Sequence, residues 1–253
     1  MELTNLKKRI IPIILINNYQ VVTSRNFSDY RVFGNLEQTI EIFNRRDVDE
    51  IIVLDIACSK NDTLLDFDIL KMMSKNTLMP FSYGGGIKTL YDIEKCLNLG
   101  CDKVSLNNVV TKNKKFLYEA VKEFGSQAIV VSLDYIVEDN KPFLYDHVTS
   151  KKFDINFDDF IKFVYDQKCG EILLSSVNSD GYLKGYDFFV LNEYRKKINC
   201  PIIVNGGCGS PIDMLNAFEN GTDACGAGSI FYYTKYGYKD IKDFLREKKI
   251  KIR

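Results

Sequence analysis

The chain has 253 residues, 45% of them hydrophobic, and its 34 Lys+Arg residues balance its 34 Asp+Glu residues. This balance excludes the basic footprint that binding to nucleic acid or to an anionic membrane requires. No apolar stretch reaches the ~18 residues of a membrane span, and the N-terminal MELTNLKKRI lacks a signal-peptide core. We therefore expect a cytoplasmic protein that binds neither nucleic acid nor a membrane.

The strand signal recurs along the whole chain, starting with RIIPIILI. Eight short apolar, β-branched runs are expected to be strands, at residues 9–16, 49–56, 79–84, 102–107, 128–134, 170–176, 201–206 and 223–228. Amphipathic stretches typical of helices lie between most of them, for example at 35–48, 89–100, 157–170 and 211–221. This alternation predicts parallel βα units.

The two halves of the chain also resemble each other at a fixed spacing. Glu50 and Glu171 are separated by 171 − 50 = 121 residues, and the same offset relates Pro80 to Pro201, Gly85 to Gly206, Gly86 to Gly207, Gly100 to Gly221, and Asp102 to Asp223. We therefore predict an α/β fold, a (βα)8 TIM barrel formed by duplication of two (βα)4 halves. It is expected to be one domain over 1–253, with half-barrels of about 9–125 and 126–253. A doubly wound sheet is the alternative, but it does not predict such a repeat.

Cysteine and histidine usage argues against a metal site. The seven cysteines form no C-x-x-C pair, and their odd number indicates reduced thiols. His147 is the single histidine, which argues against zinc and against a Ser-His or Cys-His nucleophile. Because it lies in the polar stretch LYDHVTSKK, it is expected to be a surface residue. We expect neither a metal nor a cofactor.

Glycines at the expected strand ends indicate anion binding. In a TIM barrel the chemistry lies at the C-terminal strand ends, and phosphate commonly binds after strands 7 and 8. The last two strands end in NGGCG and GAGS, and the third and fourth end in YGGGI and SLNN. Glycine lets backbone N–H groups approach an oxyanion, although tight turns also require glycine. Two such pairs favour a ligand phosphorylated at both ends.

Charged residues occupy the opposite, N-terminal ends of the strands. Arg9, Glu50, Lys103 and Glu171 precede or begin the first, second, fourth and sixth strands. From composition alone, such charges at a barrel bottom are read as a stabilising ring of salt bridges.

Several motifs then carry a family resemblance over essentially the whole chain. KRIIP, VLDI, GGGI, DKVS, FGSQA, GEILL, the DG of NSDGYLKGYD and the GG of IIVNGGCG stand in order at the family's spacing. The chain resembles HisF, the cyclase subunit of imidazole glycerol phosphate synthase. The resemblance implies that a HisH-like glutaminase docks on the barrel bottom and that ammonia crosses the barrel interior. At the other face it would react with PRFAR, which carries two phosphates, to give imidazole glycerol phosphate and AICAR.

The resemblance also assigns roles to residues. Arg9, Glu50, Lys103 and Glu171 match the family's gate to the ammonia passage, and Asp102 matches an acid that contacts the glutaminase. The implied phosphate-binding positions, with the paired glycines included, are Gly85, Gly86, Asn107, Asn108, Gly181, Gly206, Gly207, Gly228 and Ser229. Asn108 stands where the family usually has threonine.

The chain departs from the family at the catalytic residues. Cyclisation uses two aspartates, at the ends of strands 1 and 5, as general acid and base; Asp134 matches the second, but the first is Leu15. Thr23 replaces the family's loop lysine. Losing one member of an acid–base pair typically costs ~10²–10⁴ in rate. Asp55 and Asp180 are possible substitutes, but neither is expected at the right strand end.

Two hypotheses follow, and a third ranks lower. The favoured one is an ammonia conduit, similar to the HisF-like paralogues encoded with bacterial surface-glycan genes, which supply ammonia to a sugar amidotransferase that makes an acetamidino group. IIPIILINN and SYGGGI resemble that branch. The alternative is a true cyclase of histidine biosynthesis. The third hypothesis is the related sugar-phosphate isomerase. It ranks lower because that enzyme also needs two acids and has no use for the gate.

Overall fold

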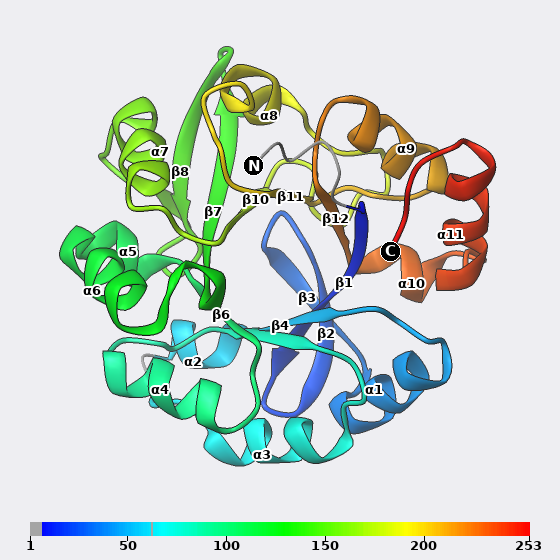
Figure 1. The fold of residues 1–253 in the computed structure, drawn as a ribbon, viewed down its shortest axis with the longest axis horizontal. Coiled ribbons are helices and arrows are strands. Elements are labelled where there is room, and N and C mark those ends of the chain that lie inside the picture. Colours follow the sequence, from blue (N-terminus) through cyan, green and yellow to red (C-terminus); the bar gives the residue numbers. More distant parts are fainter. Residues whose placement is uncertain (1–6, 62) are drawn as a thin grey trace.

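Eight parallel strands close into a barrel in the computed structural model, which describes residues 7–61 and 63–253 (Figure 1). They are β1 (Arg9–Asn17), β4 (Ile51–Asp55), β5 (Phe81–Gly84), β6 (Lys103–Leu106), β7 (Ile129–Glu138), β10 (Glu171–Ser176), β11 (Ile202–Asn205) and β12 (Ala224–Ala227). Each pairs in parallel with the next, and β12 pairs with β1. The predicted TIM barrel is confirmed.

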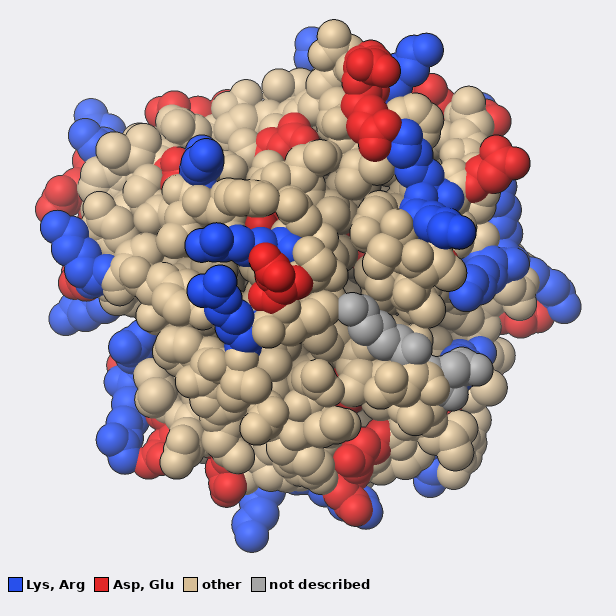
Figure 2. All heavy atoms as spheres, turned by 180° about the vertical axis from the view of Figure 1, so that it is seen from behind, with Lys and Arg blue, Asp and Glu red and all other residues tan. Residues whose placement is uncertain are grey.

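Helices surround this ring of strands (Figure 1), and side chains of both charges are interspersed around the molecule as seen from the opposite side (Figure 2). They are α1 (Leu36–Arg45), α2 (Ile56–Lys60), α3 (Phe67–Asn76), α4 (Leu90–Asn98), α5 (Asn108–Lys112), α6 (Lys114–Phe124), α7 (Phe157–Asp166), α8 (Phe189–Tyr194), α9 (Pro211–Glu219), α10 (Ser229–Tyr233) and α11 (Tyr238–Glu247), with a 3₁₀ turn at Ser126–Ala128. None of the helices in the described ranges is long and apolar enough to cross a membrane.

Alternation along the strands divides the apolar residues between two cores. In β1, Ile10 and Ile14 point outward and belong to the large core shared with the helices, whereas Ile11 and Ile13 point into the barrel. The inner cluster consists of Ile11, Ile13, Ile52, Val130, Leu173, Ile203 and Ala224. β1 is therefore buried on both sides, which is why its sequence is almost continuously apolar.

Two antiparallel additions extend the barrel at its C-terminal end, and the sequence patterns did not indicate them. β2 (Gln20–Arg25) folds back on β1, and β3 (Ser28–Asn35) pairs with β2. β8 (Lys141–Asp146) folds back on the extended end of β7, and the two-residue strand β9 (Lys151–Lys152) pairs with β8. Asn18 with Tyr19, and Asp139 with Asn140, form the turns with positive φ.

The contacts of the first half recur in the second at the offset of 121. The amide of Phe81 donates to the Asp102 carboxylate at 3.0 Å, and the amide of Ile202 donates to Asp223 at 2.9 Å. Capping boxes start α4 at Thr89 and α9 at Ser210, also 210 − 89 = 121 residues apart. The two halves thus share local geometry as well as sequence spacing; their origin by duplication stays a prediction.

Candidate functional site

A cavity of about 580 Å³ opens at the C-terminal ends of the barrel strands. All eight barrel strands or the loops that directly follow them contribute to its lining, and the hairpin of β2 and β3 adds Val22, Thr23, Ser24, Phe27 and Tyr30 at the rim. We call this cavity the mouth. Its position agrees with the general rule that TIM-barrel sites lie at this end.

All nine predicted phosphate-binding residues line the mouth. They are Gly85, Gly86, Asn107, Asn108, Gly181, Gly206, Gly207, Gly228 and Ser229. Several of the glycines are also required by the backbone: Gly85 has φ +107°, and a Cβ there would lie 2.0 Å from the carbonyl oxygen of Asp55. The turn requirement and an anion-binding role are therefore both compatible with the same residues.

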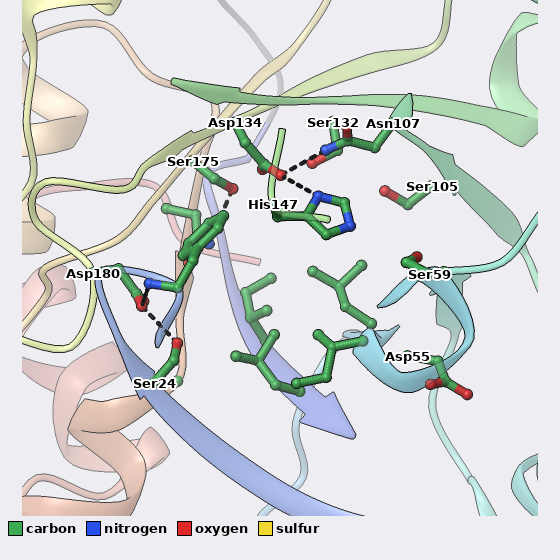
Figure 3. Close-up of a pocket in the computed structure, with 18 of the residues that line it drawn as sticks. Ser24, Asp55, Ser59, Ser105, Asn107, Ser132, Asp134, His147, Ser175 and Asp180 are labelled. Carbon is green, nitrogen blue, oxygen red and sulfur yellow. Dashed lines mark hydrogen bonds and ion pairs between the residues drawn. The ribbon is translucent and has the colours of Figure 1, made fainter. Parts of the chain in front are cut away.

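Asp134 lies at the mouth and has two hydrogen-bond partners (Figure 3). Its Oδ2 accepts a hydrogen bond from Asn107 Nδ2 at 2.8 Å and lies 3.1 Å from His147 Nδ1. The carboxylate is 7% exposed, so each partner matters for keeping its charge in a buried setting.

The prediction that His147 is a surface residue is wrong. Its side chain is only 15% exposed and lines the mouth beside Asp134. The error has a non-local cause: β8 pairs antiparallel with β7, so the residue that follows β8 returns to the strand end that carries Asp134. The polar neighbours of His147 in the sequence give no sign of this.

Leu15, at the position of the missing aspartate, belongs to an apolar surface. It lies beside Leu54 on the adjacent strand, and both pack against the inner cluster that includes Ile13. Asp55 cannot replace the acid from its present position, because its carboxylate caps α2 and accepts a hydrogen bond from the Tyr83 hydroxyl at 3.1 Å.

Asp180 is a second carboxylate that lines the mouth. Its Oδ2 accepts hydrogen bonds from Ser24 Oγ at 2.6 Å and from the Phe27 amide at 3.3 Å. Burial raises the pKa of Asp180 to about 6, although these two hydrogen bonds oppose the shift. The side chain is held by the first hairpin, in the loop that follows β10 rather than at the end of β1. Thr23, in the same hairpin, is hydrogen-bonded to the Tyr233 hydroxyl at 2.8 Å.

Below the mouth, the barrel interior changes from polar to apolar. The mouth reaches down to Ile13 and to three serines on adjacent inward positions, Ser105, Ser132 and Ser175. The buried hydroxyl of Ser105 has no hydrogen-bond partner among the residues that the structure describes. The remaining members of the inner cluster lie further down and separate this region from the barrel bottom.

The four predicted gate residues meet at the barrel bottom. Arg9 Nη1 lies 2.8 Å from Glu50 Oε1 and 3.0 Å from Glu171 Oε1, and Lys103 Nζ lies 2.7 Å from Glu171 Oε1. Although burial alone would lower it, attraction to both carboxylates raises the pKa of Arg9. Arg253 also lies 3.4 Å from Glu50. We call Arg9, Glu50, Lys103 and Glu171 the bottom ring.

Asp102 immediately precedes β6 and Lys103, so it lies at the same end of the barrel, where its residue is exposed. One of its carboxylate oxygens accepts the hydrogen bond from Phe81 noted above. Its exposure leaves the side chain accessible at the barrel bottom.

Comparison with known proteins identifies the family. The model of the family described as "Histidine biosynthesis protein" matches residues 9–237. This chain belongs to that family. A *Campylobacter jejuni* protein with the provisional name imidazole glycerol phosphate synthase subunit hisF2 is 39% identical over 98% of this chain and 99% of its own length. The HisF subunits of *Natranaerobius thermophilus* and *Wolinella succinogenes* are 34% and 36% identical, each over 98% of this chain and 99% and 98% of their own lengths.

The chain is thus of the HisF type, and the resemblance drawn from its motifs is confirmed. Two groups at the mouth of this HisF-type barrel escaped sequence reasoning. The serines could have been found from their period-2 spacing to ring and mouth residues, since Ser105 follows Lys103 by two and Ser132 precedes Asp134 by two. His147 offered no such signal. In the described ranges, no cluster of three His, Cys, Asp or Glu side chains could hold a metal.

Proposed function

We propose that this HisF-type chain carries ammonia from a HisH-like glutaminase to a sugar amidotransferase in surface-glycan biosynthesis. The glutaminase would dock at the barrel bottom, near Asp102 and the bottom ring. The mouth would bind a phosphorylated small molecule and release ammonia without performing the family's two-acid cyclisation.

One observation carries this proposal: the bottom ring is complete while the acid–base pair at the mouth is not. The four ring residues make the contacts expected of a closed gate. Leu15, in contrast, lies against Leu54 in an apolar surface, and a hydrocarbon side chain can neither donate nor accept a proton. A protein that only delivers ammonia needs the first feature and can lose the second.

The barrel interior is compatible with passage of a small neutral molecule, provided that side chains move. Ammonia entering past the bottom ring meets the inner cluster, in which Val130 and Leu173 are fully buried. An apolar layer favours neutral ammonia over ammonium, because burying an unpaired charge is costly. Above it, the hydroxyls of Ser105, Ser132 and Ser175 offer hydrogen bonds before the mouth.

One relative supports a paralogous branch of the family. The *Campylobacter jejuni* protein is named hisF2, and its identity to this chain, 39%, exceeds the 34% and 36% of the two HisF subunits compared above. This supports placement in a paralogous branch, and the choice of surface-glycan chemistry over cyclisation rests on Leu15.

A genetic experiment tests the proposal. The gene should fail to rescue a histidine auxotroph that lacks the cyclase subunit. Its disruption in its own host should leave growth without histidine intact and remove the acetamidino group from surface sugars. Rescue of the auxotroph at the level of an ordinary HisF gene would refute the proposal.

A cyclase of histidine biosynthesis is the second candidate, and one arrangement favours it. The mouth is lined by two groups that could transfer protons: the Asp134–His147 pair and Asp180. Since Asp180 has a pKa of about 6, it could act as a general acid near neutral pH. In that case Asp180→Asn and Asp134→Asn would each abolish turnover of PRFAR, whereas the conduit should deliver ammonia with either substitution.

A further inference from the structure

His147 occupies a position in the mouth that the phosphate-binding pattern of the family does not include. It is the only histidine in the chain. The carboxylate oxygen that contacts its Nδ1 also accepts the hydrogen bond from Asn107, at 3.1 Å and 2.8 Å respectively. Because both side chains meet at one oxygen, the imidazole lies directly beside Asn107, one of the predicted phosphate-binding residues.

The second ring nitrogen is directed into the cavity. With Nδ1 at the Asp134 carboxylate, Nε2 lies on the opposite side of the ring, and it has no hydrogen-bond partner among the described residues. Figure 3 shows this side of the ring facing Ser105 and Ser59 across the mouth. The Ser59 hydroxyl accepts a hydrogen bond from the Gly86 amide at 3.3 Å. Nε2 therefore faces the space between Asn107 and the Gly86 turn.

We propose that His147 is an anion-binding residue of the mouth, which donates a hydrogen bond from Nε2 to a phosphate held near Gly86, Asn107 and Asn108. The proposal rests on the proposed function in one respect, that the mouth takes a phosphorylated ligand. Protonation gives the imidazole a positive charge, and a charge-assisted hydrogen bond to an oxyanion is about twice as strong as a neutral one. Affinity at this end of the ligand therefore rises as the pH falls through the range in which histidine titrates.

The charges around His147 determine how strongly its protonation favours binding of an anion. The titratable groups that line the mouth on this side or interact with Asp134 are Asp55, Asp134, Lys88, Lys112, Tyr30 and Asp180, with Asp146 behind Asn108. Asp146 accepts a hydrogen bond from Asn108 Nδ2 at 2.9 Å; burial opposes the shift, but hydrogen bonds from Val148, Asn108 and Thr149 lower the pKa of Asp146. The carboxylates outnumber the two lysines, so a positive charge on the imidazole offsets negative charge that would otherwise oppose an anion.

The opposite end of the ligand site has a different character. Gly181, Gly207, Gly228 and Ser229 line it without a histidine, and the Ser229 hydroxyl has no protein partner among the described residues. Anion binding at that end should not depend on the protonation of an imidazole. The titratable neighbour at that end is Asp180 beside Gly181, whose pKa burial raises to about 6. The two ends of the mouth are therefore distinguished by the side chain that titrates, an imidazole at one end and a carboxyl group at the other.

The single histidine makes the test direct. The imidazole resonances of the full chain are followed by NMR from pH 5 to 9, with and without sulfate, a tetrahedral probe whose charge is constant over this range. We expect saturating sulfate to move the titration midpoint of His147 upward by about one pH unit, which by linkage corresponds to about tenfold tighter binding to the protonated form. His147→Gln should lose the part of the pH dependence that the imidazole contributes and keep only the change that Asp180 causes near pH 6. Ser229→Ala should leave the shift of His147 unchanged.

Three results would overturn the inference: no binding of sulfate at any pH, binding that leaves the His147 midpoint in place, or a wild-type pH profile in His147→Gln. None of these readouts involves ammonia delivery or PRFAR. The proposed conduit could therefore fail while this inference holds, and the reverse is equally possible.

Discussion

Replacing Arg9 by methionine removes the centre of the bottom ring and should destabilise the protein. Within residues 7–61 and 63–253, Arg9 is the only side chain that forms ion pairs with both Glu50 and Glu171, and its own side chain is 13% exposed. Breaking a buried ion pair by removing one partner costs about 3–5 kcal/mol, because a buried charge is left uncompensated. Here each carboxylate retains another cation: Lys103 at 2.7 Å from Glu171, and Arg253 at 3.4 Å from Glu50. The loss should therefore lie near the lower limit, about 3 kcal/mol.

Urea unfolding followed by circular dichroism measures this loss, with the m-value as a check that the unfolded state is unchanged. In thermal unfolding, about 3 kcal/mol corresponds to a fall in Tm of about 6–12 °C for a chain of this size. Arg45→Met is the matched control: Arg45 pairs with Glu41 on the exposed face of α1, and its loss should cost less than about 0.5 kcal/mol. If Arg9→Met were no more destabilising than this control, the ring would not be the buried charge network described above.

Three further predictions concern individual sites. Burial raises the pKa of Asp180 above its ordinary value of 3.8 to about 6, so the stability contributed by its protonated form is complete below pH 3.8 and is lost as the pH rises through 6. Asp180→Asn should therefore be about 3 kcal/mol more stable than the wild type at pH 8 and indistinguishable from it near pH 3.5, as measured by urea unfolding; equal stabilities at both pH values would contradict this. A hydrogen bond from Cys169 lowers the pKa of Cys200, the one cysteine that is not buried, so iodoacetamide should label Cys200 first, and Cys200→Ser should remove the fast phase seen by mass spectrometry. Gly85→Ala would force a Cβ against a carbonyl oxygen at positive φ and should cost about 3 kcal/mol or prevent folding, whereas Gly34→Ala, with open space around it, should change the unfolding midpoint little.

The barrel could be predicted because its signals are local and repeated. Each strand is a short β-branched run, and the offset of 121 residues places Gly85 and Gly206 at equivalent turns with φ of +107° and +97°. The strands that the sequence did not indicate lack this signal. β3 is mostly exposed along its length, so it has no apolar face, and its pairing depends on the turn that β2 makes from β1.

The location of a site residue could be predicted where its position along a strand determines it. It was missed where the location depends on which strands pair in the folded structure. Ring and mouth residues follow from counting along the strands, so Lys103 lies in the bottom ring and Asp134 lines the mouth. Which ring residues contact each other did not follow, because Arg9 and Glu171 are brought together only by closure of the barrel. His147 reaches Asp134 because β8 folds back on β7, and a surface position was the natural expectation for a histidine among polar neighbours.

The turnover of PRFAR by the purified protein with an ammonium salt tests the central claim most directly. A HisF relative assayed alongside, such as the subunit from *Wolinella succinogenes*, provides the reference rate. We expect no formation of imidazole glycerol phosphate above the background without protein, because Leu15 cannot act as an acid or a base. Turnover near the reference rate would contradict it and would establish that other groups at the mouth have taken over the proton transfer.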